Sequence, residues 1–490
     1  MAPLALTATR ASQLRLGWIT FTNMNTKQLI ELGVPETALA EAGAFIVALR
    51  ESGGAMARLP EEMAAIVAQP EAFLGDPLRA ALARELYEPS FSMREVPAPW
   101  RQWGEGLDAA AVAQLANACT LPISVAGALM PDAHVGYGLP IGGVLATEGA
   151  VIPYAVGVDI ACRMKLTVFE RKASTLAGMR DRLANIIEDE TRFGMGAEFQ
   201  ARRNHDVMDD DWSVSPITKH LREKAWKQLG TSGTGNHFVE FGEFTVNAAE
   251  SLRFAEDGRD IPPGAYLALL SHSGSRGTGA QVCQHYSRIA MDRHAKLPAQ
   301  LKHLAWLDLT SEPGAEYWAA MELMGRYAAA NHACIHRHIT KKVSAAVLLD
   351  IENHHNFAWK EQHFGREVIV HRKGATPAGA GVMGVIPGSM ATPGFVVRGR
   401  GNADSLNSAS HGAGRVMSRT KAMQSFTWSA VKKQLAAAGV ELLSAGLDEN
   451  PGVYKDIHTV MAAQTDLVDV MGQFSPKLVK MAPAGEKAED

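Results

Sequence analysis

The sequence predicts an α+β fold, and three observations support this class. From residue 27 to residue 87, apolar residues recur at intervals of three and four, which indicates amphipathic helices. From Leu121 onward, short β-branched runs are separated by glycine and proline, which indicates buried strands. Helical spacing returns at residues 179–193 and 315–343. The chain therefore combines helices with sheets.

The order of these elements predicts how the chain is organised. Gly53-Gly54 and Pro70 divide the first helical stretch into separate helices. The first buried strands are expected at residues 122–130, 139–147 and 150–158. We expect three regions, namely an appended helical N-terminal region (1–95), one large domain (96–480) and a flexible tail (481–490).

Composition limits the classes of protein that this chain can belong to. With 490 residues, of which 47% are hydrophobic, it can bury one large core or several smaller ones. The net charge of −4 disfavours non-specific coating of nucleic acid but allows a local basic groove. Neither a signal peptide nor an apolar run of about eighteen residues is present, so no membrane partner is expected. The four cysteines lack regular spacing, which predicts free thiols in a reducing cytoplasm.

Residues 371–414 are rich in glycine and poor in acids. The segment holds ten glycines and a single carboxylate, Asp404. Glycine lets backbone N–H groups approach an anion, and guanidinium groups add paired hydrogen bonds. The cationic side chains in and beside the segment are Arg372, Lys373, Arg398, Arg400 and Arg415. The pattern predicts a phosphate cradle in which His411 could attack phosphorus.

Polar residues near the ends of predicted strands form a candidate metal site. Asp159 and Cys162 follow a β-branched run, and their spacing places both on one side of a tight turn. His237 follows one glycine-rich loop, and His272 opens another. Each residue alone has an ordinary structural interpretation, as a turn cap or a packed core residue. Together, however, these residues offer a carboxylate, a thiol and imidazoles, which can form one metal site jointly.

Of the remaining histidines, one is added to the candidate metal ligands and two are excluded from them. His354 and His355 are adjacent, so on a strand only one of them can meet a given metal. A thiolate, a carboxylate and three imidazoles are enough for two ions that share the cysteine, and they suit Mn²⁺ or Zn²⁺ better than Mg²⁺ or Ca²⁺. His332 and His336 lie four apart on a predicted helix, but no glutamate follows His332 in the metalloprotease manner. We interpret them as packed or polar-face histidines.

Eight motifs in one order resemble the signature of the RtcB family of RNA-splicing ligases. They are MPDAHVGYGLPIGG (130–143), AVGVDIACR (155–163), GTSGTGNHFVE (230–240), SHSGSRG (271–277), HHNF (354–357), HRKGAT (371–376), PGSM (387–390) and HGAGRVMSR (411–419). The resemblance covers roughly residues 100–480 and leaves the first hundred residues unexplained. It implies mixed or antiparallel sheets around a central cleft with outer helices.

The resemblance also implies an activity. Such a ligase uses GTP and Mn²⁺ to join an RNA 3′-phosphate or 2′,3′-cyclic phosphate to a 5′-hydroxyl, through a histidine that takes GMP and an RNA-pp-G intermediate. That role falls on His411. An archease-like protein is a possible activating partner. The implied metal ligands are Asp159, Cys162, His237, His272 and His355, with Cys162 bridging two ions.

Further matches imply a guanylate pocket. The residues on segments that contact GMP in the family are Asn236, His237, Phe238, Val239, Glu240, His355, Asn356, Pro387, Gly388, Ser389, Met390, Gly412, Ala413, Gly414 and Lys480. Glu240 could accept hydrogen bonds from guanine N1 and N2, which adenine does not offer, and this is a physical reason for GTP over ATP.

One residue departs from the family pattern. Family members usually carry glycine after the metal cysteine, whereas this chain has Arg163, whose side chain must point away from the ions or repel them. Asp132 and His134, in the first motif, are expected to support the site or to contact RNA. Two alternative functions stay open at this point: a metal-dependent phosphoesterase or cyclic phosphodiesterase acting on RNA ends, and a divergent RNA-end binding paralogue.

Overall fold

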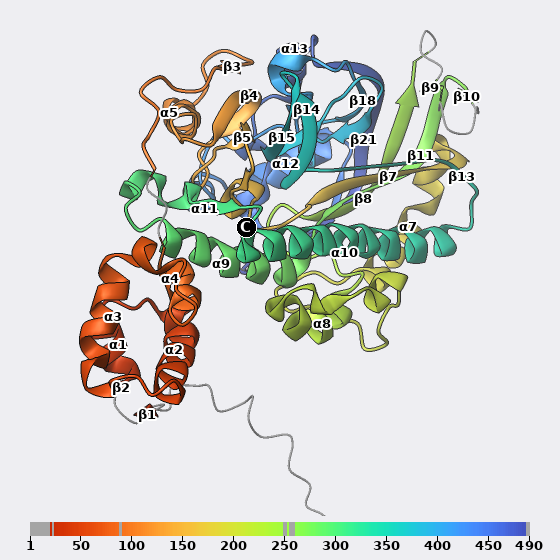
Figure 1. Ribbon diagram of the computed structural model, residues 1–490. Coiled ribbons are helices and arrows are strands. Elements are labelled where there is room, and N and C mark those ends of the chain that lie inside the picture. The colour runs from red at the N-terminus through yellow and green to blue at the C-terminus, as the bar shows by residue number, and fades with distance from the viewer. Residues whose placement is uncertain (1–19, 22–23, 88–90, 248–251, 254–259, 487–490) are drawn as a thin grey trace, which may run out of the picture. The chain divides into compact units, whose positions relative to one another are not determined.

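The computed structural model describes residues 20–21, 24–87, 91–247, 252–253 and 260–486 (Figure 1). The chain divides into two compact units. The first runs to Phe91 and includes Met291–Ala295, and the second consists of Ser92–Ala290 and the chain from Lys296 onward. None of the helices in the described residues is long and apolar enough to cross a membrane.

The first unit is a small helical bundle. Its first helix begins at a capping box, in which the Asn25 side chain accepts from the Gln28 backbone N–H and the Gln28 side chain accepts from the Asn25 backbone N–H. Leu29, Phe45 and Ile66 are among the side chains that fill its core. The elements are β1 (Thr20–Phe21), β2 (Met24–Asn25), α1 (Thr26–Glu31), α2 (Leu39–Glu51), α3 (Leu59–Ala68) and α4 (Ala80–Leu86). The helical spacing is thus confirmed, and the boundary at residue 95 stays a prediction.

The second unit contains an eight-stranded sheet in the order β13-β7-β11-β8-β21-β18-β17, with β20 also paired to β21. Neighbours along this path are antiparallel, and only β20 runs parallel to β21. The strands are β7 (Arg163–Lys172), β8 (Phe238–Val246), β11 (Gly264–Ser273), β13 (Val347–His354), β17 (Met383–Ile386), β18 (Gly394–Gly399), β20 (Glu441–Ser444) and β21 (Val468–Met481).

A five-stranded sheet has the order β14-β15-β5-β4-β3, with only β3 and β4 parallel. Its strands are β3 (Trp100–Gln102), β4 (Ser124–His134), β5 (Ile141–Thr147), β14 (Phe357–His363) and β15 (Arg366–Lys373). Three short ladders join β6 (Ala150–Val151) to β12 (Leu307–Asp308), β16 (Ala375–Pro377) to β19 (Ser408–Ser410), and β9 (Leu252–Arg253) to β10 (Asp260–Ile261). The predicted mixture of mostly antiparallel sheets is confirmed.

Helices lie against the outside of the large sheet. α7 and α10 pack their apolar faces on β7, β8, β11 and β21, through residues such as Leu183, Ile335 and Phe241. Figure 1 shows α10 as a single long helix beside these strands. The helices of this unit are α5 (Ala109–Ala118), α6 (Pro153–Val156), α7 (Leu176–Glu190), α8 (Pro216–Gln228), α9 (Arg276–Arg293, whose end belongs to the first unit), α10 (Glu312–Val343), α11 (Arg419–Ser425), α12 (Trp428–Ala437) and α13 (Ile457–Ala462).

One predicted strand is wrong. Residues 122–130 and 139–147 do form strands, but residues 150–158 form only the two-residue β6 and then the single turn α6. Pro153 occupies the first turn of α6, where its missing N–H costs nothing. Gly157, with φ of 106°, then ends the turn. This interruption places the Asp159–Cys162 turn immediately before the first residue of β7.

Candidate active site

The second unit contains a cavity of about 870 Å³, a size that suits a nucleotide-sized ligand. Its walls come from the ends of strands in both sheets and from the loops that follow them, including the β4–β5, β15–β16 and β19–α11 connections. Strand ends are rigid, whereas the loops between them present backbone groups and polar side chains. The cavity therefore combines fixed side-chain positions with accessible N–H groups.

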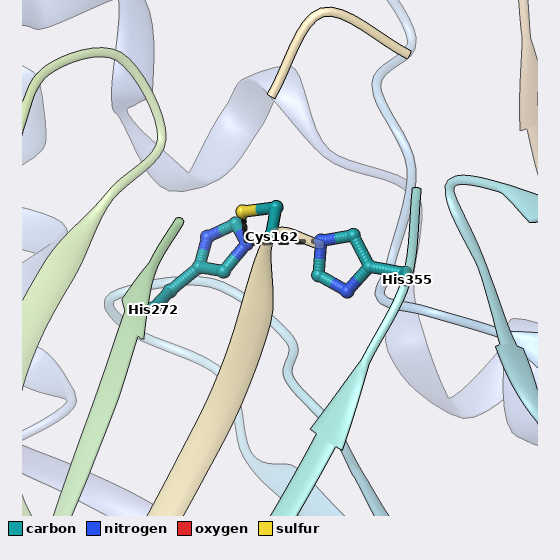
Figure 2. Close-up of side chains that lie close together, drawn as sticks. All are labelled: Cys162, His272 and His355. Atoms are coloured by element: carbon teal, nitrogen blue, oxygen red, sulfur yellow. Dashed lines mark hydrogen bonds between the residues drawn. The ribbon is translucent and has the colours of Figure 1, made fainter. Parts of the chain in front are cut away.

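Cys162 lies at the centre of a cluster of potential metal ligands. Its Sγ is 3.0 Å from His272 Nε2, and His272 Nε2 is 3.2 Å from His355 Nε2 (Figure 2). The same sulfur is 3.4 Å from His237 Nε2, which lies 3.0 Å from Asp159 Oδ2. The ligand atoms thus fall into two groups of three that share Cys162, one with His272 and His355 and one with Asp159 and His237.

Strand pairing explains why residues so far apart in sequence converge. β11 pairs with β7 on one side and β8 on the other, so His272 lies opposite both Met164 and Phe238. Cys162 and His237 immediately precede those two strands. The turn from Asp159 to Cys162 is closed by a backbone hydrogen bond of 3.2 Å between them. The predicted placement of both side chains at one tight turn is therefore observed.

Hydrogen bonds to backbone carbonyls set the tautomer of two of the imidazoles. His237 Nδ1 lies 3.0 Å from the Ser232 carbonyl, and His272 Nδ1 lies 3.1 Å from the Asn236 carbonyl. Each Nδ1–H donates to its carbonyl, so each Nε2 keeps a lone pair for a metal. Burial lowers the pKa of His272 to about 3, which keeps its ring neutral.

Asp159 supplies the negative charge of the cluster. Burial alone would raise its pKa, but the hydrogen bond and charge of His237 and the charge of Arg276 outweigh burial and lower it to about 2. Ser275 N donates to the other carboxylate oxygen at 2.9 Å. A carboxylate, a thiol and imidazole nitrogens together match the donor preference of divalent transition ions. The residues present therefore fit the expected pair of ions.

His411 lies beside this cluster with one ring nitrogen already engaged. Its Nδ1 is 2.8 Å from Asp132 Oδ2, and its backbone N–H donates to the same oxygen at 3.3 Å. Asp132 is fully buried, and the His411 ring lies 4.8 Å from that of His355. Because Nδ1–H donates to Asp132, the lone pair is left on Nε2. Sequence reasoning left the role of Asp132 open, since no local pattern links it to a residue 279 positions later.

Most residues expected at the guanylate pocket do line the cavity. Glu240 is buried there, and burial raises the pKa of its carboxyl well above the usual range. Asn356 Oδ1 accepts from Gly374 N at 2.8 Å and so connects two walls. The lining residues from the expected set are Asn236, His237, Phe238, Glu240, His355, Asn356, Pro387, Gly388, Ser389, Met390, Gly412, Ala413 and Gly414.

Val239 and Lys480 are the expected pocket residues that do not line it. They are paired with each other in the β8–β21 register, whereas their neighbours Glu240 and Val479 face the cavity. Since adjacent residues on a strand point to opposite faces, both side chains lie on the α7 side of the sheet. Val239 is packed in the core there, and Lys480 Nζ donates to Glu188 at 2.5 Å. The structure therefore does not support their assignment to the guanylate pocket.

Comparison with known proteins identifies the family. The family described as "tRNA-splicing ligase RtcB" matches residues 114–215 and 204–481. The RNA-splicing ligase RtcB of Escherichia coli is 36% identical over 411 residues, which is 76% of this chain and 95% of that protein. The chain belongs to the RtcB family. The tRNA-splicing ligase RtcB of Methanococcus maripaludis is 31% identical over 76% of this chain and 90% of its own length.

Arg163, where RtcB proteins were expected to carry glycine, points away from the ligand cluster. Its buried guanidinium forms an ion pair with the partly exposed Glu352 and donates to the Gly325 carbonyl at 2.9 Å. His354, the neighbour of His355, also faces away and packs against Phe357 and Trp359. The arginine is thus compatible with two cations in the cluster.

His332 and His336, set aside as packed histidines, are indeed buried outside the cluster. Both lie within hydrogen-bond reach of the Ser271 hydroxyl, and His336 Nδ1 also lies 2.8 Å from the Thr167 hydroxyl. Burial lowers the pKa of both rings well below the usual range. They stabilise the packing of α10 on the sheet as neutral groups.

The basic residues of the glycine-rich segment divide into two sets. Lys373 and Arg415 line the cavity of this RtcB protein, as does Arg419. By contrast, Arg372 is fully buried in an ion pair with Glu361, and Arg400 pairs with Asp469. Fewer basic side chains of the glycine-rich segment therefore face the cavity than the sequence suggested.

Proposed function

We propose that this RtcB protein is an RNA ligase that uses GTP and two Mn²⁺ ions to join a 3′-phosphate or 2′,3′-cyclic phosphate end to a 5′-hydroxyl end. The single observation that carries the proposal is the position of His411, held by Asp132 with Nε2 available beside two ligand groups that share Cys162. The relatives described as RNA-splicing and tRNA-splicing ligases support the reaction class.

The first step is transfer of GMP to His411. Its Nε2 lone pair attacks the α-phosphorus of GTP, a P–N bond forms, and the bond to the β-phosphate oxygen breaks to release pyrophosphate. Positive charge develops on the imidazole as this happens. Asp132, buried and bonded to Nδ1, compensates that charge and keeps the ring in the reactive tautomer. Lys373 and Arg415 lie in the cavity wall where they can bind the departing phosphates.

The second and third steps join the RNA ends. An oxygen of the RNA 3′-phosphate displaces His411 from the guanylyl phosphorus, so the P–N bond breaks and an RNA-pp-G end forms. The 5′-hydroxyl of the other strand then attacks the 3′-phosphorus, loses its proton and expels GMP. A cyclic phosphate must first be opened by water to give the 3′-phosphate.

The expected metal ligands would hold the two ions on either side of Cys162. Asp159, Cys162 and His237 would hold one ion, and Cys162, His272 and His355 the other. When bound, such ions withdraw charge from phosphate oxygens and lower the pKa of water. The same donors suit Zn²⁺, which we consider the less favoured metal for this reaction.

Glu240 would select guanine over adenine. Its carboxyl is buried at the cavity wall, where guanine N1–H and N2–H can donate to both oxygens, whereas adenine has no matching pair of donors. An unpaired buried carboxylate is costly, so adenine in this position would leave Glu240 unsatisfied.

Guanylylation tests the proposal directly. The protein is incubated with MnCl₂ and GTP labelled at the α-phosphate, and we expect an acid-labile protein adduct. His411→Ala should abolish the adduct, and the exposed His458→Ala should leave it unchanged. A phosphoesterase acting on RNA ends would process cyclic phosphates without any adduct. The RNA substrate, the archease-like activator and the cytoplasmic location stay predictions. The four cysteines of the chain are buried, and no disulfide joins them.

A further inference from the structure

An exposed aromatic side chain lies at the mouth of the cavity. Tyr137, in the loop between β4 and β5, lines the cavity and is 66% exposed. Of the large hydrophobic side chains that are exposed among the described residues, the other aromatic one is Phe364, in the turn between β14 and β15. Phe364 does not line the cavity. Single exposed hydrophobic side chains are common on protein surfaces, so it is the position of Tyr137 on the cavity wall that distinguishes it from Phe364.

The backbone that carries Tyr137 is held on several sides. Gly136 N donates to the Gln114 side chain at 3.0 Å, and Gln114 donates back to the Gly136 carbonyl. Gly138, with φ of 71°, approaches the His303 backbone so closely that an added Cβ would lie 2.9 Å from its carbonyl oxygen. Lys373 Nζ donates to the Tyr137 carbonyl at 2.5 Å. The exposed ring is therefore mounted on a fixed backbone.

The Tyr137 ring lies beside other aromatic rings, and its backbone is connected through Lys373 to the surroundings of His411. The His303 ring meets Tyr137 edge-on at 5.7 Å and is itself edge-on to Tyr154 at 4.7 Å. Lys373, which binds the Tyr137 carbonyl, precedes Gly374, and a Cβ on Gly374 would lie 3.2 Å from His411 Cε1. Lys373 thus connects the backbone of Tyr137 to Gly374, the residue that lies against the His411 ring.

We propose that Tyr137 is a stacking platform for a nucleobase of the RNA next to the end being joined. This inference depends on the proposed function and adds a binding subsite to it. Every base has a π face, so stacking on an aromatic side chain holds a single strand without reading its sequence. Lys373 holds the loop that carries the ring through its hydrogen bond to the Tyr137 carbonyl. The ring can therefore position an RNA end whose sequence is not fixed.

Steady-state ligation of two RNA oligonucleotides, one with a 3′-phosphate and one with a 5′-hydroxyl, tests this subsite. Tyr137→Ala should raise the KM for RNA about tenfold and leave kcat unchanged, whereas Tyr137→Phe, which keeps the ring, should behave as wild type. Phe364→Ala is the matched control, because it removes the other exposed ring and should change neither constant. An unchanged KM in Tyr137→Ala, or an equal loss in Tyr137→Phe, would overturn the inference.

A base-removal experiment separates stacking from a structural effect. An abasic site is placed at each of the three nucleotides on either side of the junction in turn. At the position that stacks, wild-type protein should show a higher KM for the abasic RNA, and Tyr137→Ala should not. Equal penalties in both proteins at every position would contradict the assignment. Guanylylation by GTP alone reports on the proposed function separately: Tyr137→Ala should form the His411 adduct at the wild-type rate, and a wild-type protein without adduct would reject the function itself.

Discussion

Replacing Asp132 by asparagine isolates the contribution of one buried carboxylate to the proposed chemistry. Asp132 Oδ2 accepts two hydrogen bonds from His411, from Nδ1 at 2.8 Å and from the backbone N–H at 3.3 Å. Its other oxygen, Oδ1, is buried without a hydrogen-bond partner among the described residues. In Asp132→Asn the amide oxygen can take the place of Oδ2 and the amide nitrogen that of Oδ1. The shape and both hydrogen bonds are then kept, and only the charge is lost.

The expected loss follows from the strength of a hydrogen bond to a charged group. Such a bond contributes about 1.5–3 kcal/mol, and this contribution grows as the imidazole becomes positive in the transition state. One factor of ten in rate corresponds to about 1.4 kcal/mol. We therefore expect Asp132→Asn to slow formation of the His411–GMP adduct by about ten- to 150-fold.

Single-turnover guanylylation with labelled GTP and Mn²⁺ measures this rate, with His411→Ala as the baseline. GTP affinity and bound manganese should stay at wild-type values, because Asp132 lines neither the guanine site nor the ligand cluster. A wild-type rate in Asp132→Asn would refute the reasoning. A slower rate accompanied by loss of manganese would also refute it, since the carboxylate would then act on the ions.

The further predictions concern four other residues. Cys162→Ser should reduce bound manganese below two ions per chain, measured by elemental analysis, whereas Cys283→Ser, at a buried thiol outside the cluster, should not. Because burial raises the pKa of Glu240, GTP binding as the carboxylate must release a proton, so GTP affinity should rise with pH through that pKa, and Glu240→Gln should remove this rise. The folded state holds that proton more tightly than the unfolded chain, so stability is lost as pH rises above the unfolded value, and Glu240→Gln should raise the Tm at pH 8 more than at pH 4. Arg163→Gly should lower the free energy of unfolding by about 1.5–3 kcal/mol in denaturant titrations, through loss of the hydrogen bonds that its guanidinium donates to Glu352 and to the Gly325 carbonyl, with manganese content unchanged. Lys480→Ala should leave the Kd for GTP unchanged, because the Lys480 side chain faces α7. A Kd about tenfold higher would instead show that Lys480 contacts GTP.

The convergence of side chains around Cys162 could be predicted from the sequence because each of these residues lies in a short motif that ends or begins a strand. Asp159 and Cys162 share one turn, and His272 is brought to them by the pairing of β11 with β7. The choice between His354 and His355 followed from strand alternation once the family was recognised. These features are local, so they can be recognised in the sequence without knowledge of the full fold.

Features that depend on register or on distant contacts were not predicted. Val239 and Lys480 lie within segments that border the pocket, but a strand exposes only alternate residues to it, and the register decides which. Asp132 meets His411 only because β4 and the β19–α11 loop come together in the folded chain. Similarly, nothing in a composition of glycine and arginine shows that Arg372 is neutralised by Glu361.

The central claim is that His411 carries the guanylyl group. Mass spectrometry of peptides after incubation with GTP and Mn²⁺, under conditions that preserve P–N bonds, tests it most directly. The account predicts the mass of GMP on the peptide that contains His411, on the ring nitrogen that Asp132 does not bind. A guanylyl group on any other residue, or a protein that joins RNA ends while its histidine peptide stays unmodified, would contradict it.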